Sequence, residues 1–82
     1  MNKVKVLFFA TLRERAGTRA LDLEIPDGMD VRGLKRRLIQ ELPNLAQALE
    51  SVLISVNHEY AFEEEVIPSN SEVALFPPVS GG

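Results

Sequence analysis

The 82-residue sequence predicts a small α+β domain in which one main helix packs across one face of a mixed sheet of four to five strands. Several short segments alternate between apolar and polar residues, as strands with one covered face do. One longer segment has apolar residues at helical spacing. The chain suffices for one modest core and shows no linker, so we expect a single domain over residues 1–76 and an extended tail over residues 77–82.

Two strands open the predicted fold. The first covers residues 3–10, and one of its faces is apolar, with Val4, Val6 and Phe8. A polar connection with helical potential follows and ends at Gly17. Alternation then resumes over residues 20–25, and the turn-forming residues 26–28, Pro-Asp-Gly, end this second strand.

One amphipathic helix comes next, and Asp30 marks its start because a carboxylate there can cap the first turn. The apolar stripe of this helix spans about 80° of the helical wheel and comprises Val31, Leu34, Leu38 and Leu42, with Ile39 at its flank. Lys35 falls inside the stripe, so we expect its ammonium group to reach out toward water. Pro43 ends the helix, and residues 45–49 form a short apolar turn.

Three further strands complete the predicted sheet, over residues 52–57, 60–62 and 72–76. Polar turns separate them, one at Asn57-His58 and one at residues 69–71. With these strands the element order is typical of a helix covering one sheet face.

Two phenylalanines are left on the outer face of this sheet. Val73 and Leu75 join the core from the last strand, so the opposite parity turns Phe76 outward, as it does Phe9 on the first strand. If the two strands are parallel neighbours, both rings lie at one end of the sheet, at the base of the tail. Exposed aromatic rings there predict a docking patch. The alternative, equally open from the pattern, is that loops or Tyr60 cover the rings.

Composition restricts the chemistry available within the chain. Cysteine is absent, which excludes thiolate metal ligands and side-chain persulfides, and the one histidine, His58, lies in a predicted turn. No phosphate-loop spacing is present, and we expect no metal site and no permanently bound cofactor. The net charge of −3 argues against nucleic-acid binding, and the basic residues within 32–37 form a solvated helix face. Without a long apolar segment or a leader, we expect a cytoplasmic protein that binds no membrane.

The tail carries the feature that points most clearly to function. Pro77 and Pro78 stop strand pairing and send the chain outward, with a reach of about 20 Å over six residues. Gly81 and Gly82 then make a segment thin enough to enter a narrow channel, although a frayed end is the alternative for a Gly-Gly pair alone. We expect the Gly82 carboxylate to be the reactive group. It is a poor electrophile, so it needs activation, for instance as an acyl-adenylate that a partner makes with ATP.

Several segments of the chain form a recognisable pattern. They are residues 5–10, Lys-Val-Leu-Phe-Phe-Ala, then Leu12-Arg13-Glu14 and Gly17, the Val56-Asn57 turn, and above all residues 72–82, Glu-Val-Ala-Leu-Phe-Pro-Pro-Val-Ser-Gly-Gly. Together they resemble the small subunit of molybdopterin synthase, a family of ubiquitin-like sulfur carriers. The turn at residues 69–71, Ser-Asn-Ser, departs from the acidic, glycine-containing turn common in that family. The resemblance implies a β-grasp fold in which the first and last strands are parallel neighbours.

The resemblance also implies which residues act. The residues expected to contact a partner are Phe9, Arg13, Tyr60 and Phe76. The tail that leads to the reactive Gly82 comprises Pro77, Pro78, Val79, Ser80 and Gly81. A ubiquitin-activating-like adenylyltransferase would adenylate Gly82 with ATP, and the carboxylate would become a thiocarboxylate. The large synthase subunit, in a heterotetramer, would receive the tail and pass the sulfur to cyclic pyranopterin monophosphate. The chain would then be a carrier without catalysis of its own.

Three kinds of rival function stay open. A pure interaction module would tolerate loss of Gly82. A sulfur carrier for thiamine or for transfer-RNA thiolation would share the fold and the Gly-Gly end, although the Phe76-Pro77-Pro78 approach favours molybdopterin. A ubiquitin-like protein modifier, attached to lysines through Gly82, would appear as conjugates of higher mass.

Overall fold

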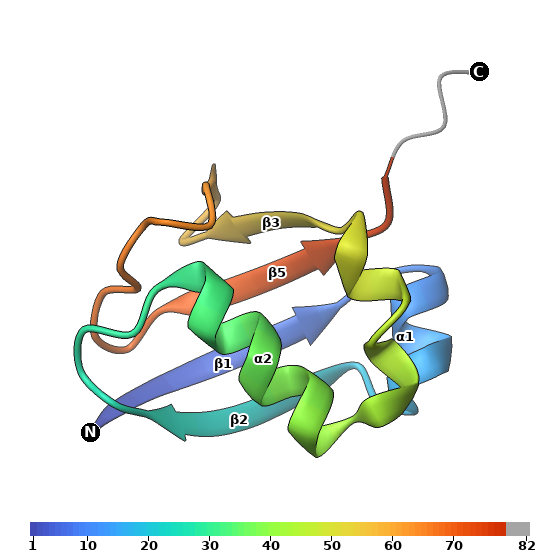
Figure 1. Cartoon of the computed structure of the whole chain (residues 1–82), viewed down its shortest axis with the longest axis horizontal. Helices are drawn as coiled ribbons and strands as arrows, with labels where there is room; N and C mark the ends of the chain where they lie inside the picture. The colour runs from blue at the N-terminus through green and yellow to red at the C-terminus, as the bar shows by residue number, and fades with distance from the viewer. Residues whose placement is uncertain (79–82) are drawn as a thin grey trace.

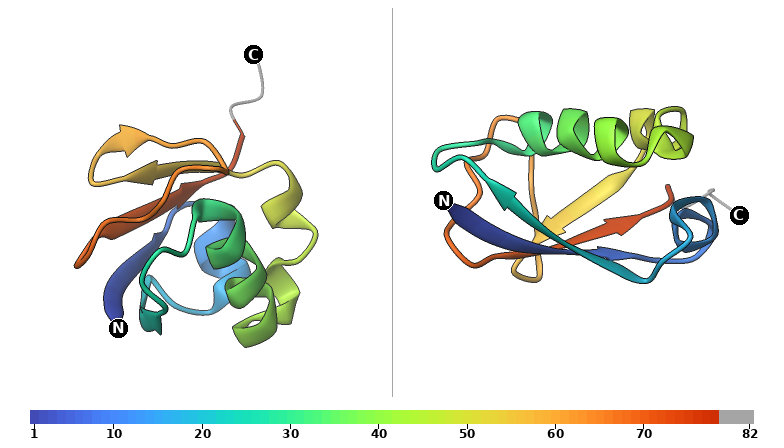
Figure 2. Two further views of the ribbon diagram at one scale, coloured as in Figure 1. Left: turned by 60° about the vertical axis from the view of Figure 1, so that its left-hand side comes forward. Right: turned by 90° about the horizontal axis from the view of Figure 1, so that it is seen from below.

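The computed structural model describes residues 1–78 and shows two layers, a five-stranded mixed sheet and a helix lying across one of its faces (Figure 1 and Figure 2). The strands are β1 (Asn2–Phe8), β2 (Ala20–Ile25), β3 (Leu53–Val56), β4 (Glu59–Tyr60) and β5 (Glu72–Phe76). The helical elements are α1 (Thr11–Ala16), α2 (Val31–Glu41) and two 3₁₀ turns, η1 (Pro43–Leu45) and η2 (Ala48–Glu50). The predicted α+β class is confirmed.

The first and last strands of the chain lie side by side and run in the same direction. The strand order is β2-β1-β5-β3-β4, and only the β1–β5 pair is parallel within the described sheet. The register places Lys5 beside Glu72 and Phe8 beside Leu75. The carboxyl ends of β1 and β5 therefore meet at one end of the sheet, next to α1 (Figure 1).

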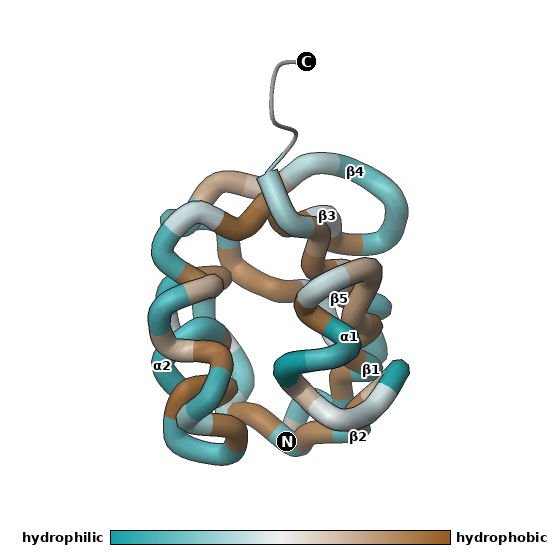
Figure 3. Tube along the Cα trace, turned by 90° about the vertical axis from the view of Figure 1, so that its right-hand side faces the viewer, coloured by the Kyte–Doolittle hydropathy of each residue, from teal (hydrophilic) through white to brown (hydrophobic). Residues whose placement is uncertain are grey.

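The core lies between α2 and the sheet. In Figure 3, seen from the end at which β5 leaves, α2 stands on one side, the strands stand on the other, and both carry hydrophobic segments. The predicted inward residues are buried, namely Val4, Val6, Phe8, Val73 and Leu75 from the strands and Val31, Leu34 and Leu38 from α2. Leu12, Leu45, Leu49 and Ile67 close the ends of this core.

Helix α2 begins as predicted but ends earlier than its apolar stripe. The Asp30 carboxylate accepts a hydrogen bond from the Gly33 N–H at 2.8 Å, so the predicted cap is confirmed. Leu42, predicted as part of the stripe, has left the helix with a φ of −133°, because Pro43 follows and begins η1. Its side chain is half-buried against the core.

Strand β1 stops at Phe8, two residues before the predicted end. Ala10 adopts φ 53° and ψ −128°, a conformation that costs a non-glycine residue about 1 to 3 kcal/mol. The strained turn is closed by the Leu12 N–H, which donates to the Phe9 carbonyl at 3.1 Å, and Leu12 is buried. Burial of Leu12 therefore holds the chain in this turn and leads it directly into α1.

The prediction of a fourth strand at residues 60–62 is wrong. It covers Glu59–Tyr60, because Asn57 and His58 both have positive φ and make a tight two-residue hairpin after β3. Phe62 has left the sheet, and its carbonyl accepts the Glu65 N–H at 3.1 Å in the next turn. The same hairpin ends β3 at Val56, one residue before the predicted end, and the strand begins at Leu53 rather than at Val52.

Asn2 anchors the predicted turn at residues 69–71. Its buried side-chain amide donates to the carbonyls of Ile67 and Pro68, at 3.1 and 3.0 Å, and its oxygen accepts the Asn70 N–H at 2.9 Å. These bonds tie the chain before β5 to the start of β1, which fixes the alignment of the parallel pair.

Lys35 does not reach out to water as predicted. Its side chain is only 15% exposed, and its ammonium nitrogen lies 2.8 Å from the Glu63 carboxylate. Arg32 also contacts this carboxylate, at 3.1 Å. The carbonyls of Glu63 and Glu65 accept the N–H groups of Arg32 and Val31, so the backbone of this acidic segment closes the start of α2.

This ion pair gives the fold a specific pH dependence. The hydrogen bond from Lys35, and then that from Arg32, hold the pKa of Glu63 below its ordinary value of 4.5. Because the pKa of Glu63 is lower in the folded state, the ion pair stabilises the fold fully at pH values above the pKa of the unfolded chain. This stabilisation is lost as pH falls through the pKa of the folded state. Glu63→Gln should therefore lower Tm at about pH 7, and its Tm should converge with that of the wild type as pH falls through the lowered pKa of Glu63. Glu64→Gln, whose carboxylate lies 3.7 Å from Arg32 and is 77% exposed, is the control. A gap between Glu63→Gln and wild type that stays constant with pH would contradict the assignment.

Candidate functional site

Two stacked phenylalanines mark the end of the sheet from which the tail departs. The ring centroids of Phe9 and Phe76 are 4.7 Å apart, and the ring planes differ by 12°. The Phe9 N–H donates to the Leu75 carbonyl at 3.2 Å, which extends the parallel pairing by one bond. The prediction that both rings lie together at the base of the tail is confirmed.

The tail begins directly after strand β5, next to this aromatic pair. Phe76 is the last residue of β5 and pairs with Leu53 of β3, and Pro77 and Pro78 follow without an intervening turn. The structure describes the chain as far as Pro78. The remaining predicted tail residues, Val79, Ser80, Gly81 and Gly82, lie outside the described residues.

The stacked rings belong to a larger apolar area on the outer face of the sheet. Leu7 and Ala74 are paired neighbours on β1 and β5 and share the outward parity of Phe9 and Phe76, although Leu7 is half-buried and Ala74 is only 8% exposed. We call these four residues the apolar patch. Phe9 stays 41% exposed, so the described residues leave part of its ring accessible, whereas Phe76 is half-buried. The alternative in which loops or Tyr60 cover both rings is therefore wrong for Phe9, and Tyr60 is itself exposed.

The other two predicted contact residues border this patch. Tyr60 is 77% exposed and lies on the edge strand β4, in the row of Ser55 and Ala74. Arg13 is exposed on α1, which stands at the tail end of the sheet (Figure 1). Phe9, Phe76 and Arg13 are thus at one end, whereas Tyr60 extends the patch toward the edge.

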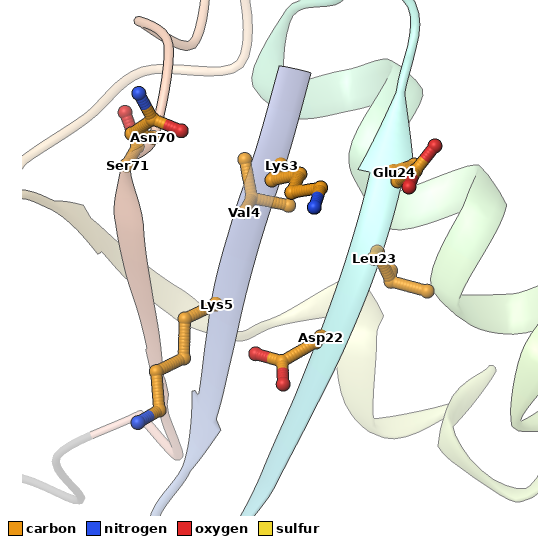
Figure 4. A pocket seen from close by; sticks show the side chains of 8 residues that line it. All are labelled: Lys3, Val4, Lys5, Asp22, Leu23, Glu24, Asn70 and Ser71. Carbon is orange, nitrogen blue, oxygen red and sulfur yellow. The ribbon is translucent and has the colours of Figure 1, made fainter. Parts of the chain in front are cut away.

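The opposite end of the outer face is charged, a feature that is not among the predictions from the sequence. A groove of about 420 Å³ is lined by Lys3 and Lys5 of β1, Asp22 and Glu24 of β2, and Asn70 and Ser71 before β5, together with Val4 and Leu23 (Figure 4). Lys3 pairs across the strands with Glu24, and Lys5 with Asp22. The sequence does contain a signal for this groove, because Lys3 and Lys5 share one face of the first predicted strand, and Asp22 and Glu24 share one face of the second. A partner seated on the apolar patch would meet these charges at its rim, where they favour one orientation.

Other candidate groups do not assemble into a centre. His58 is 86% exposed and lies 3.7 Å from the Glu72 carboxylate, so it stands in a solvated turn as predicted. Among residues 1–78, no three histidine, aspartate or glutamate side chains gather closely enough to hold a metal ion. Neither is any helix of that region long and apolar enough to cross a membrane.

Comparison with known proteins agrees with this arrangement. The model of the ThiS family matches residues 6–82. The molybdopterin synthase sulfur carrier subunit of Dictyostelium discoideum is 37% identical over 84 residues, which cover 99% of this chain and 98% of that protein.

Solved structures show the same fold. SAMP1 from Haloferax volcanii superposes with a TM-score of 0.87 at 28% identity, covering 99% of this chain and 100% of that one. A chain in the complex of subunits 1 and 2 of molybdopterin-converting factor from Helicobacter pylori gives a TM-score of 0.69 at 23% identity, over 98% and 99% of the two chains, which shows likeness of fold alone. The chain therefore has the ubiquitin-like β-grasp fold and belongs to the ThiS family, in keeping with its resemblance to the small subunits of molybdopterin synthase.

Proposed function

We propose that this chain is the sulfur carrier of a molybdopterin synthase and holds its sulfur as a thiocarboxylate on Gly82. The observation that carries the proposal is the stacked Phe9–Phe76 pair at the point where β5 passes into Pro77 and Pro78. An exposed aromatic anchor beside the start of an outgoing tail suits a protein that docks with its folded part and reacts with its end. The name of the 37% identical relative supports the same function.

The proposed chemistry begins with activation. The Gly82 carboxylate attacks the α-phosphorus of ATP on a ubiquitin-activating-like adenylyltransferase, which gives an acyl-adenylate and releases pyrophosphate. A donor of sulfur at the oxidation level of hydrosulfide then displaces AMP and leaves the thiocarboxylate. This order follows from the poor electrophilicity of a free carboxylate. It also suits a chain without cysteine, because the sulfur travels on the chain end.

Transfer would take place in the large subunit of the synthase. The thiocarboxylate sulfur bonds to a carbon of cyclic pyranopterin monophosphate as an oxygen group leaves that carbon. Water then cleaves the C–S bond of the resulting thioester, which leaves the sulfur on the pterin and restores the Gly82 carboxylate. In this proposal the carrier contributes no catalytic residue and no permanently bound cofactor. It acts in the cytoplasm, where ATP is available, within a heterotetramer of two small and two large subunits.

Docking would use the apolar patch. Phe9 and Phe76 form a rigid anchor because the fold sets their stack before a partner arrives, which lowers the entropic cost of binding. Arg13 and Tyr60 border the patch and would contact the same partner. The Helicobacter pylori complex of subunits 1 and 2 supports a partner of this kind for the fold.

Mass spectrometry of the intact chain tests the proposal. Incubation with ATP, the adenylyltransferase and hydrosulfide should raise the mass by about 16 Da, as oxygen is replaced by sulfur, and omission of ATP should prevent the shift. Addition of the large subunit and cyclic pyranopterin monophosphate should then restore the original mass. A mass that never changes would refute the sulfur-carrier function. A shift that the large subunit and pterin do not reverse would refute the role in molybdopterin synthesis and favour a carrier for another thiolation pathway.

Protein modification is the second candidate, favoured by the likeness to SAMP1, which is named a small archaeal modifier protein. Both functions begin with the acyl-adenylate and differ in the nucleophile, a lysine amine or a sulfur donor. Conjugates of the chain to lysines of other proteins, formed with ATP and lost without Gly82, would support modification.

A further inference from the structure

The described sheet has two edges, and they differ in length. Strand β4 has two residues, whereas β2 has six and only β1 as its neighbour. An edge strand of that length presents a row of backbone N–H and C=O groups with which another chain can pair. The β2 edge is thus the place where a second copy could extend the sheet.

One hydrogen bond shows which groups of β2 point outward. The Phe8 N–H donates to the Arg19 carbonyl at 2.9 Å, so residue 19 bonds inward to β1. In an antiparallel pair the direction alternates from residue to residue. Ala20, Asp22 and Glu24 therefore direct their backbone groups away from the sheet.

Side chains already occupy the two ends of this outward row. The Thr18 hydroxyl donates to the Ala20 carbonyl at 2.9 Å and accepts the Ala20 N–H at 3.4 Å. At the other end, the Arg37 guanidinium reaches from α2 and donates to the Glu24 carbonyl at 3.2 Å. Between them, only the N–H and C=O of Asp22 and the N–H of Glu24 are left for pairing.

We propose that Thr18 and Arg37 close the β2 edge against a second copy of this chain. In a two-fold antiparallel pairing centred on Asp22, Ala20 of one copy faces Glu24 of the other. At both ends of this pairing, the carbonyls that would have to accept hydrogen bonds from the other copy, those of Ala20 and Glu24, are already bonded to Thr18 and Arg37. The two Asp22 carboxylates would also face each other on one side of the sheet, which opposes pairing further.

The closed edge keeps the protein monomeric. Sheet extension through β2 would put a second copy beside the charged groove, which Asp22 and Glu24 line. A monomer leaves the whole outer face, including the apolar patch, accessible to another protein. This inference does not depend on the chemistry proposed for Gly82.

Substitutions that keep shape but remove the two bonds test the proposal. Thr18→Val keeps the branched side chain without its hydroxyl, and Arg37→Met keeps most of the stem without the guanidinium. In sedimentation equilibrium, the wild type should stay monomeric at every concentration used. The double variant should form dimers, with a dissociation constant at least tenfold below the limit that the wild-type data set. Amide hydrogen exchange at Asp22 and Glu24, fast in the monomer, should slow as the dimer forms.

Two controls separate this effect from loss of charge. Glu41→Gln breaks the 3.0 Å ion pair with Arg37 but leaves the bond to the Glu24 carbonyl, and Arg36→Met removes a charge from the same helix. Both should remain monomeric. A double variant that keeps its circular dichroism spectrum and stays monomeric would overturn the proposal. A dimer in which the Asp22 and Glu24 amides exchange as fast as in the wild type would overturn it too, because another surface would then hold the copies together.

Discussion

Deletion of Gly82 should abolish sulfur transfer and leave the fold unchanged. The core and the five strands that the structure describes lie within residues 2–76, so we expect the folded part to form without the end of the tail. The shortened chain ends in Gly81, and its carboxylate would stop about 3.5 Å short of the position that the activating and transferring sites accept. Melting temperature and conversion of cyclic pyranopterin monophosphate are measured on the same sample. We expect an unchanged Tm and a conversion below detection.

Matched variants define what the result means. One residue added after Gly82 should be equally inactive, because it moves the carboxylate too far and replaces the group that is adenylated. Ser80→Ala keeps the length and both glycines and should retain activity. Conversion at the wild-type rate by either the deleted or the extended chain would exclude Gly82 as the sulfur-bearing residue.

Much of the fold followed from local pattern. Alternation located β1, β2 and β5, because each has one face on α2 and one face outward, and Asp30 located the start of the helix. The aromatic pair followed from the same parity, since Phe9 and Phe76 are each one residue beyond a buried core residue. The part of the site that strand alternation determines, namely the position of the two rings, could therefore be predicted from the sequence.

What the sequence did not predict depends on contacts between distant segments. The Lys35–Glu63 pair joins residues 28 positions apart, and an apolar stripe on a helix does not indicate which carboxylate will meet its one lysine. The Asn2 bonds to the 67–70 turn span more than 60 positions. Ala10 was missed for another reason. Its positive φ is unfavourable for alanine, and only the burial of Leu12 and the pairing of Phe9 make it necessary.

Phe8 and Phe76 should respond in opposite ways to replacement by alanine. Phe8 is 2% exposed in the core, so Phe8→Ala should lower the free energy of unfolding by about 3 to 5 kcal/mol. Phe76 is only half-buried, and its stack with Phe9 contributes roughly 0.5 to 1.5 kcal/mol beyond its burial. Phe76→Ala should therefore cost less stability than Phe8→Ala. As a docking anchor, however, Phe76 should account for about 2 kcal/mol or more of binding, roughly a 30-fold loss of affinity for the large subunit.

Denaturant unfolding and calorimetric titration with the large subunit separate these two effects. Phe62→Ala is the control, because Phe62 is 73% exposed but lies beyond β4, outside the apolar patch, and should affect neither quantity. Phe8→Ala should bind with nearly wild-type affinity at temperatures where it is still folded, since its ring faces α2 and not the partner. If Phe76→Ala bound as tightly as Phe62→Ala, the stacked pair would be a cap on the end of the sheet, and docking would have to use another surface. If Phe8→Ala and Phe76→Ala lost equal stability, the outward placement of Phe76 would be wrong.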